Sequence, residues 1–139
     1  MKICVISEYS HLLSKGGTEY YTELLASGLA AHGCEVLIVC RGSRYVDVET
    51  RIVATENGSY QVKLLPADRY SKDEVQQQVI SRTWPYINSI LHAFQPDVVH
   101  VHTLSTFFNI RHFEVLTQLF RNVISVSYTH LTLPTNREV

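Results

Sequence analysis

Apolar and polar positions along the chain alternate between two kinds of segment. Short, almost continuous apolar runs rich in β-branched residues occur at KICVIS (2–7), EVLIVC (35–40) and PDVVHVH (96–102). Runs of this length and composition are typical of strands that are covered on both faces. Between them, apolar residues recur three and four positions apart, which is the spacing of an amphipathic helix. The pattern predicts an α/β fold in which a Rossmann-like parallel sheet is flanked by helices.

The segment between the first two strands has the form of a βαβ unit. The spacing predicts a helix over residues 18–32, followed by Gly33 as a left-handed C-terminal residue. Because glycine is unfavourable inside a helix, Gly28 indicates a close approach of helix to sheet. We expect the buried stripe of this helix to consist of Tyr21, Leu24, Leu25, Gly28 and Leu29.

The rest of the chain predicts a hairpin and two more helices. Asn57-Gly58 lies between two alternating segments, which is a hairpin signal. Ser71 and Glu74 have the spacing of a capping box for a helix that ends near residue 94, and Pro85 should kink or split it. A further helix is expected over residues 107–120, with one face formed by Phe108, His112, Val115, Leu116 and Leu119.

Composition bounds the class of protein. The chain has 139 residues, 45% of them hydrophobic, and a formal net charge of −1, which fits one globular domain. A charge near zero gives no indication of a nucleic-acid partner. No apolar run approaches the roughly 18 residues of a membrane span. The three cysteines lie in or beside apolar runs, so we interpret them as reduced residues of a cytoplasmic protein.

Two adjacent glycines stand between the first strand and the first helix. Gly16 and Gly17 fall at the edge where the strands of an open parallel sheet end, which is where such sheets bind ligands. Backbone without Cβ atoms can approach a ligand closely, and a helix N-terminus favours a phosphate. A flexible turn without any ligand explains the glycines equally well. Two glycines fall short of a G-x-G-x-x-G fingerprint, which argues against a dinucleotide site.

Glu19 in the first helical turn has two readings. Carboxylates stabilise helix N-termini, and this is the commoner reason for one at such a position. A carboxylate would oppose a phosphate at the same place, so Glu19 either orients the loop or contacts a sugar hydroxyl.

His100 and His102 share one face of the third strand. No third ligand stands nearby, which argues against a metal site. His102 ends the strand on the same edge as the glycines, where it can donate a hydrogen bond to a phosphate or sugar oxygen. Thr103 adds a hydroxyl at this edge, although a polar loop that caps the next helix explains it as well.

The stretch GGTEYYTELLASGLAAHGCEVLIVC, followed after a gap by PDVVHVHT, resembles the N-terminal domain of glycosyltransferase family 4 over residues 1 to about 122. Members are retaining enzymes of GT-B architecture that use nucleotide diphosphate sugars. The resemblance implies the N-terminal half of a GT-B fold, the first of two Rossmann-like domains that face a cleft. It implies His102 as the catalytic residue, and as substrate-binding residues Gly16, Gly17, Thr18, Glu19 and Thr103.

The resemblance also implies the partners. They are a nucleotide-sugar donor, an acceptor held near residues 8–15, and a C-terminal GT-B domain that this sequence lacks. No metal or other cofactor is expected, and the absence of an acidic D-x-D cluster from the sequence agrees with this. Peripheral contact of the intact enzyme with a membrane surface is left open.

The end of the sequence departs from the family pattern. VSYTHLTLPTNREV (126–139) resembles a translated sequencing-library adapter, so we expect a native domain over 1–124 and a non-native tail over 125–139, although VISVSYTH has the composition of a further strand. The chain is then a truncated glycosyltransferase fragment, inactive alone and prone to associate. The alternatives are a stand-alone module that binds a phospholigand or partner without catalysis, and an oxidoreductase on the same fold.

Overall fold

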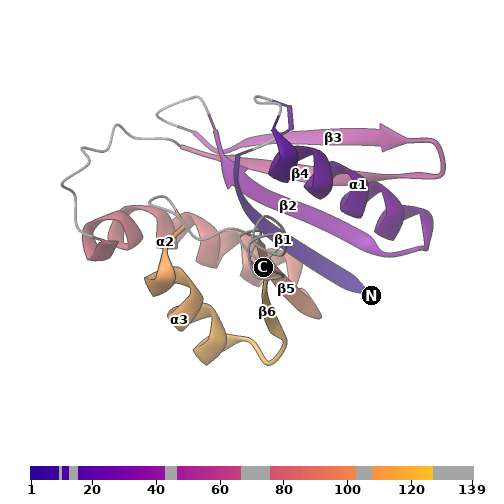
Figure 1. The fold of residues 1–139 in the computed structure, drawn as a ribbon. Helices are drawn as coiled ribbons and strands as arrows, with labels where there is room; N and C mark the ends of the chain where they lie inside the picture. Colours follow the sequence, from indigo (N-terminus) through magenta and orange to yellow (C-terminus); the bar gives the residue numbers. More distant parts are fainter. Residues whose placement is uncertain (10, 13–15, 43–46, 67–75, 103–107, 127–139) are drawn as a thin grey trace, which may run out of the picture.

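The computed structural model of the chain describes residues 1–9, 11–12, 16–42, 47–66, 76–102 and 108–126 (Figure 1). Strands and helices alternate along most of this part, as the apolar pattern predicted. In chain order the elements are β1 (Lys2–Tyr9), α1 (Gly17–Ala31), β2 (Glu35–Arg41), β3 (Glu49–Thr55), β4 (Gly58–Leu65), α2 (Gln76–Phe94), β5 (Val98–His102), α3 (Ile110–Leu119) and β6 (Val123–Val126).

The strands form a single sheet with β1 in its interior. Their order is β3-β4-β2-β1-β5-β6. The β3–β4 pair is antiparallel, and the remaining pairs are parallel. Ile3 of β1 lies opposite Val36 of β2 on one side and Val98 of β5 on the other. The prediction of a Rossmann-like α/β fold is confirmed.

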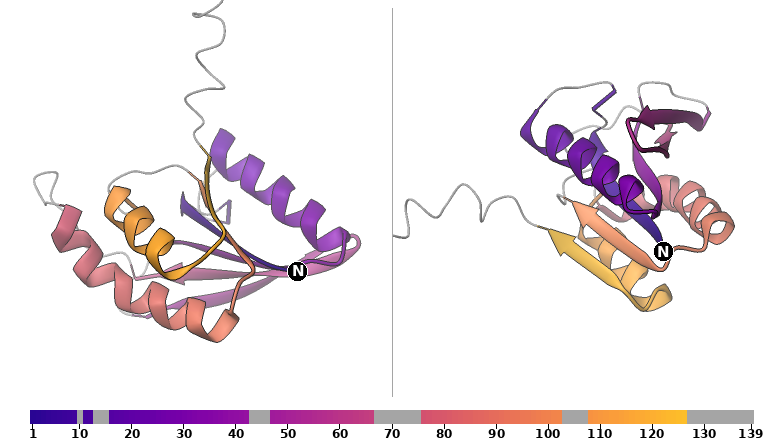
Figure 2. Two further views of the ribbon diagram at one scale, coloured as in Figure 1. Left: turned by 90° about the horizontal axis from the view of Figure 1, so that it is seen from below. Right: turned by 90° about the vertical axis from the view of Figure 1, so that its right-hand side faces the viewer.

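Helices cover both faces of the sheet (Figure 2). One face of β1, with Cys4 and Ile6, packs in a core cluster with residues of α2 and α3. The other face, with Ile3 and Val5, packs against α1. Successive residues of β1 are therefore buried on alternate sides, which is why the sequence of this strand is a continuous apolar run.

Helix α1 buries only part of the stripe that the sequence predicted, because Leu29 packs against the core whereas other members of the stripe do not. Tyr21 and Leu24 are 42% and 53% exposed. The residues that are buried instead are Glu19, Thr22, Ala26 and Ala30. Small side chains allow a helix to lie close to a sheet, and here Ala26 is part of the core cluster and Leu29 packs against it, while Tyr21 and Leu24 face outward. The sequence analysis gave most weight to large apolar residues, and it therefore assigned Tyr21 and Leu24 to the buried face of the helix.

The glycines of α1 have different roles. Gly33 has φ +86°, and its N–H and that of Cys34 donate to the carbonyls of Ala30 and Leu29. These are the bonds of a Schellman motif, so the predicted C-terminal glycine is confirmed. Gly28 is exposed, and a Cβ added there would meet no described atom within 4 Å beyond its chain neighbours and its own helix backbone. The predicted close approach of Gly28 to the sheet is therefore wrong.

The remaining elements agree with the sequence in outline. The hairpin is present, with Thr55 paired to Gly58 across the turn. Helix α2 passes through Pro85 without being split, and its predicted cap at Ser71 and Glu74 lies outside the described residues. Helix α3 is shorter than expected, and Leu119 on its predicted buried face is exposed. None of the three cysteines forms a disulfide; Cys4 and Cys40 are buried and Cys34 is half-buried.

A buried hydrogen-bond network joins α3 to α2. The backbone N–H of Asn109, the N-cap residue of α3, donates to Nδ1 of His112 at 3.0 Å. Nδ1 therefore carries no proton, so Nε2–H donates to Oγ1 of Thr83 at 2.6 Å. Burial lowers the pKa of His112 to about 4. The network needs a neutral imidazole, because a proton on Nδ1 would remove the acceptor of the cap.

Substitution of Gly28 by alanine is expected to stabilise the chain. Gly28 is helical and exposed, and alanine is favoured over glycine inside a helix by about 1 kcal/mol. Urea unfolding of Gly28→Ala should show a higher midpoint than wild type. The matched control is Gly33→Ala, which should lower the midpoint because its φ lies in the left-handed region. Equal shifts for the two variants would contradict this assignment.

The His112 network is expected to make stability depend on pH. The pKa of His112 in the folded chain is about 4, below its ordinary value of 6.5. Between these values the unfolded chain binds a proton that the folded chain does not, so stability decreases as pH falls through this range, by roughly 1–3 kcal/mol for a shift of this size.

Urea unfolding midpoints between pH 7.5 and 4 test this dependence. His112→Gln should be less stable than wild type at pH 7.5 but should lose less on acidification. His92→Gln, at an exposed position of α2, is the control outside the network. An identical pH dependence in wild type and His112→Gln would show that His112 does not titrate on unfolding.

Candidate functional site

The direction in which successive strands are added to the sheet reverses between β1 and β5. From β1 the chain passes to β2 through α1 on one face, and later returns to the opposite side of β1 as β5 through α2 on the other face. The carboxyl ends of β1 and β5 are therefore adjacent, and the connections that leave them diverge. Ligands of open α/β sheets bind in the crevice formed at such a point. The predicted site residues belong to segments that meet there.

Gly16 and Gly17 begin α1 at this edge. Gly16 is the N-cap residue with φ −136°, and Gly17 is the first helical residue. A glycine N-cap has no side chain to accept from the first N–H groups of the helix, so these groups are not capped in the usual way. A Cβ added to Gly17 would meet no described atom within 4 Å outside its own chain neighbours and helix backbone. The backbone at Gly17 is thus open.

Glu19 folds back over Gly16. A methyl group added to Gly16 would collide with Oε2 of Glu19, so the carboxylate lies directly against this glycine. Glu19 is buried, although it is charged. Its negative charge occupies the positive end of α1, which is a favourable position for a carboxylate. An anion bound at Gly16 would meet this carboxylate. A Cβ position built on Gly17, in contrast, has no such neighbour within 4 Å.

His102 ends β5 and has no exposed surface. Its Nε2 lies 3.1 Å from Nδ1 of His100, with the two ring centroids 4.2 Å apart. Burial, and secondarily His100, lower the pKa of His102 to about 4. The ring is therefore neutral at neutral pH, so it can exchange hydrogen bonds but supplies no positive charge.

Tyr21 links the glycines to His102. The ring centroids of Tyr21 and His102 lie 5.9 Å apart. Tyr21 is four residues after Gly17, so the two lie one turn apart on the same face of α1. The start of α1 and the end of β5 are therefore at the same edge of the sheet. The sequence assigned Tyr21 to the apolar stripe of the helix and gave no indication that its ring lies against the histidine.

Two predicted site residues are not fully described. Thr103 lies outside the described residues. Thr18 is the second residue of α1, but its side chain is not among those described. Their assignment as substrate-binding residues remains a prediction.

The structure adds polar groups that the sequence analysis did not select. Oε1 of Glu8, which is buried at the end of β1, lies 3.8 Å from Nη1 of Arg41 at the end of β2. His11, in the connection between β1 and α1, is held by Tyr60, whose hydroxyl lies 2.7 Å from its Nε2. The signal for Glu8 was available, since a charge at the end of a buried strand is unusual. His11 contacts a residue that is distant in the sequence, so no local sequence pattern indicated this contact.

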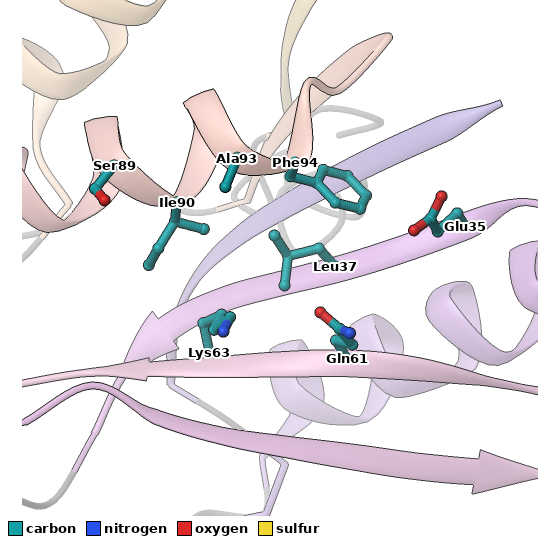
Figure 3. A pocket seen from close by; sticks show the side chains of 8 residues that line it. All are labelled: Glu35, Leu37, Gln61, Lys63, Ser89, Ile90, Ala93 and Phe94. Atoms are coloured by element: carbon teal, nitrogen blue, oxygen red, sulfur yellow. The ribbon is translucent and has the colours of Figure 1, made fainter.

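A separate groove lies on the opposite face of the sheet (Figure 3). It has a volume of about 390 Å³ between β2, β4 and α2, and Lys63, Leu37 and Phe94 are among its lining residues. Lys63 donates to Thr50 at 2.8 Å. The groove is on the α2 side of the sheet, whereas His102 is on the α1 side. The groove is therefore not part of the candidate site.

The described residues offer neither a metal site nor a membrane-spanning helix. No cluster of three or more histidine, cysteine, aspartate or glutamate residues is placed so as to hold a metal ion. None of the helices in the described ranges is both long and apolar enough to cross a membrane.

Comparison with known proteins identifies the family. The sequence model of Glycosyltransferase Family 4 matches residues 15–136, whereas a comparison with curated proteins gave no match. Among solved structures, the chain is similar to sucrose-phosphate synthase from Thermosynechococcus elongatus, with a TM-score of 0.65 and 16% identity over 91% of this chain and 32% of that one. This likeness shows the fold alone, and the chain spans about a third of that protein. Because the family match covers most of the sequence, including the glycines and His102, the chain belongs to glycosyltransferase family 4.

Proposed function

We propose that the chain is the acceptor-side domain of a glycosyltransferase that moves a sugar from a nucleotide diphosphate sugar to an acceptor hydroxyl with retention at the anomeric carbon. Membership of glycosyltransferase family 4 supports the class of reaction. The geometry of the site supports placing the donor diphosphate at the start of α1. The donor and acceptor are substrates, and the proposed chemistry needs no metal ion.

Gly17 is the observation that carries the proposal. Glycine at a helical position is less favourable than alanine, so its presence needs a reason. Gly17 is helical, so a positive φ does not explain it. The space around it is open among the described residues, so packing does not explain it either. Gly28 is equally open, so what distinguishes Gly17 is its place at the N-terminus of α1 on the carboxyl edge of the sheet, where the N–H groups of the helix start favour an anion.

The proposed chemistry requires stabilisation of negative charge on the leaving nucleotide diphosphate. Main-chain N–H groups at the start of α1 can supply it without reorganisation during the reaction. Retention then requires the acceptor to be held on the same face as the leaving group, which is a positioning task. Glu19, which already lies against Gly16, is placed to accept from a sugar hydroxyl, and the diphosphate then lies at Gly17.

His102 contributes as a neutral hydrogen-bonding group in this proposal. Its pKa of about 4 leaves the ring without charge at neutral pH. It has no exposed surface, so a ligand reaches it only when neighbouring groups move. Tyr21 lies against it and is itself 42% exposed, so this side chain is one of the groups proposed to move.

The chain is proposed to bind substrate but not to complete the reaction alone. It spans about a third of the similar sucrose-phosphate synthase chain. The described residues would contact one side of a donor bound at α1. Transfer requires further protein surface that contacts the other side of the donor. A stand-alone binding module is the alternative, and it shares the same site.

Gly17→Ala is expected to weaken ligand binding without weakening the fold. The added methyl group would lie between the helix start and the ligand, so affinity for uridine diphosphate glucose and for pyrophosphate, used as probes, should fall about tenfold or more, equivalent to roughly 1.4 kcal/mol. Amide chemical shifts of the 139-residue chain during titration would measure binding, with the wild-type response centred on Gly16 and Gly17.

Gly28→Ala is the matched control, since it makes the same chemical change on the same helix away from the site. It should raise stability and leave the response to both probes unchanged. The placement of the diphosphate is wrong if the Gly16 and Gly17 amides respond to neither probe, or if Gly17→Ala binds as wild type does. Binding without sugar transfer by the full-length product of the gene would favour the binding module.

A further inference from the structure

The hydroxyl group of Tyr60 joins three elements on the α1 face of the sheet. Its oxygen lies 2.7 Å from Nε2 of His11, in the connection between β1 and α1, and the two ring centroids are 6.0 Å apart. Ser27 of α1 forms a hydrogen bond with the same hydroxyl. The ring of Tyr60 is 2% exposed and belongs to the core cluster that packs against α1. Tyr60 therefore links β4, the connection and α1.

The connection that Tyr60 holds leads to the glycines of the candidate site. The chain leaves β1 at Tyr9 and reaches the N-cap of α1 at Gly16. Between these residues His11 is bonded to Tyr60, and Leu12 packs against the same core cluster. Fixing two residues inside a connection restricts the positions that the following residues can take. The contact with Tyr60 therefore limits where the chain can place Gly16.

We propose that Tyr60 is a positioning residue for the ligand site: its hydroxyl fixes His11, and through His11 the connection that places Gly16 and Gly17. The inference rests on the proposed function in one respect, which is that a diphosphate binds at Gly17. Tyr60 is buried in the core, so it acts on the ligand only through the residues that it holds.

The surroundings of Tyr60 keep its hydroxyl protonated. Burial, and secondarily the charge of Glu23 on α1, raise the pKa of Tyr60 to about 12. Burial lowers the pKa of His11, and Glu23 opposes this shift. The hydroxyl therefore keeps its hydrogen at neutral pH, and a hydroxyl can donate one hydrogen bond while it accepts another. Phenylalanine would fill the same core position without a polar atom, so the contacts with His11 and Ser27 are what the hydroxyl adds.

Backbone NMR of the 139-residue chain tests the inference without a ligand. Tyr60→Phe keeps the ring in the core and removes only the hydroxyl. We expect the amide resonances of Gly16 and Gly17 to move from their wild-type positions, whereas that of Gly33, at the other end of α1, should stay. Tyr86→Phe makes the same chemical change at a 38% exposed position of α2, and it should leave all three resonances unchanged.

Titration with pyrophosphate and with uridine diphosphate glucose measures the consequence for binding. Tyr60→Phe and His11→Ala should each bind both probes about three- to tenfold more weakly than wild type, as expected for the loss of one hydrogen bond. The double variant should bind no more weakly than the weaker single variant, because both changes remove the same contact. His11→Gln should bind nearly as wild type does, since its amide can replace the imidazole as a partner of the hydroxyl.

The inference is overturned if the Gly16 and Gly17 amides of Tyr60→Phe match those of wild type, or if the losses of affinity in Tyr60→Phe and His11→Ala add in the double variant. If Tyr60→Phe fails to fold, as judged by circular dichroism, the same measurements on His11→Ala and His11→Gln decide the question.

Failure of this inference is distinct from failure of the proposed function. Displaced Gly16 and Gly17 amides in Tyr60→Phe, in a chain that responds to neither probe, would keep Tyr60 as the residue that positions the connection and would remove the donor site. A wild-type response at Gly17 that Tyr60→Phe retains at full affinity would keep the donor site and remove the role of Tyr60.

Discussion

The burial of β1 between two parallel neighbours is the constraint on which the rest of the structure depends. A strand paired on both sides and covered on both faces must be apolar throughout, and β1 satisfies this up to Ile6. The chain leaves β1 on one face of the sheet and approaches β5 from the other. Two connections therefore diverge at the carboxyl edge, and the crevice between them follows from the topology before any functional side chain is considered.

Most of the buried polar side chains of the described residues lie toward this edge. The eight buried polar or charged residues of the described chain are Ser7, Glu8, Glu19, Thr22, Thr83, His102, Asn109 and His112. Each lies at the end of β1 or β5, or at the start or in the first half of a helix that begins at the carboxyl edge. Burying a polar group is unfavourable unless it is partnered, so a fold selected for stability alone has little reason to concentrate them. The position of these residues agrees with a ligand site at the carboxyl edge of the sheet, next to an apolar core.

The sequence predicted the features that depend on local periodicity. Continuous apolar runs identified the buried strands, and Gly33 identified the end of α1 because its position requires a left-handed backbone. The common edge of Gly17 and His102 was also predictable, since the carboxyl ends of parallel strands meet on one side of a sheet.

Features that depend on tertiary packing were not predictable in this way. The buried face of α1 was assigned wrongly because Ala26 and Ala30 carry a weaker apolar signal than Tyr21 and Leu24, although their small size is what allows the helix to approach the sheet. The fold-back of Glu19 onto Gly16 and the bond between His100 and His102 depend on side-chain rotamers. Sequence spacing places such groups near one another but does not determine whether they touch.

The outward position of Tyr21 follows from the same arrangement. A side chain that covers a buried imidazole blocks any ligand, so a site of the proposed kind requires the cover to be removable. A tyrosine packed between α1 and the sheet could leave only by separating the helix from the core. Tyr21 is instead 42% exposed, so movement of its ring would not require Ala26 and Ala30 to leave the core. The contact between Tyr21 and His102 thus lies outside the packing of Ala26 and Ala30 that holds α1 on the sheet.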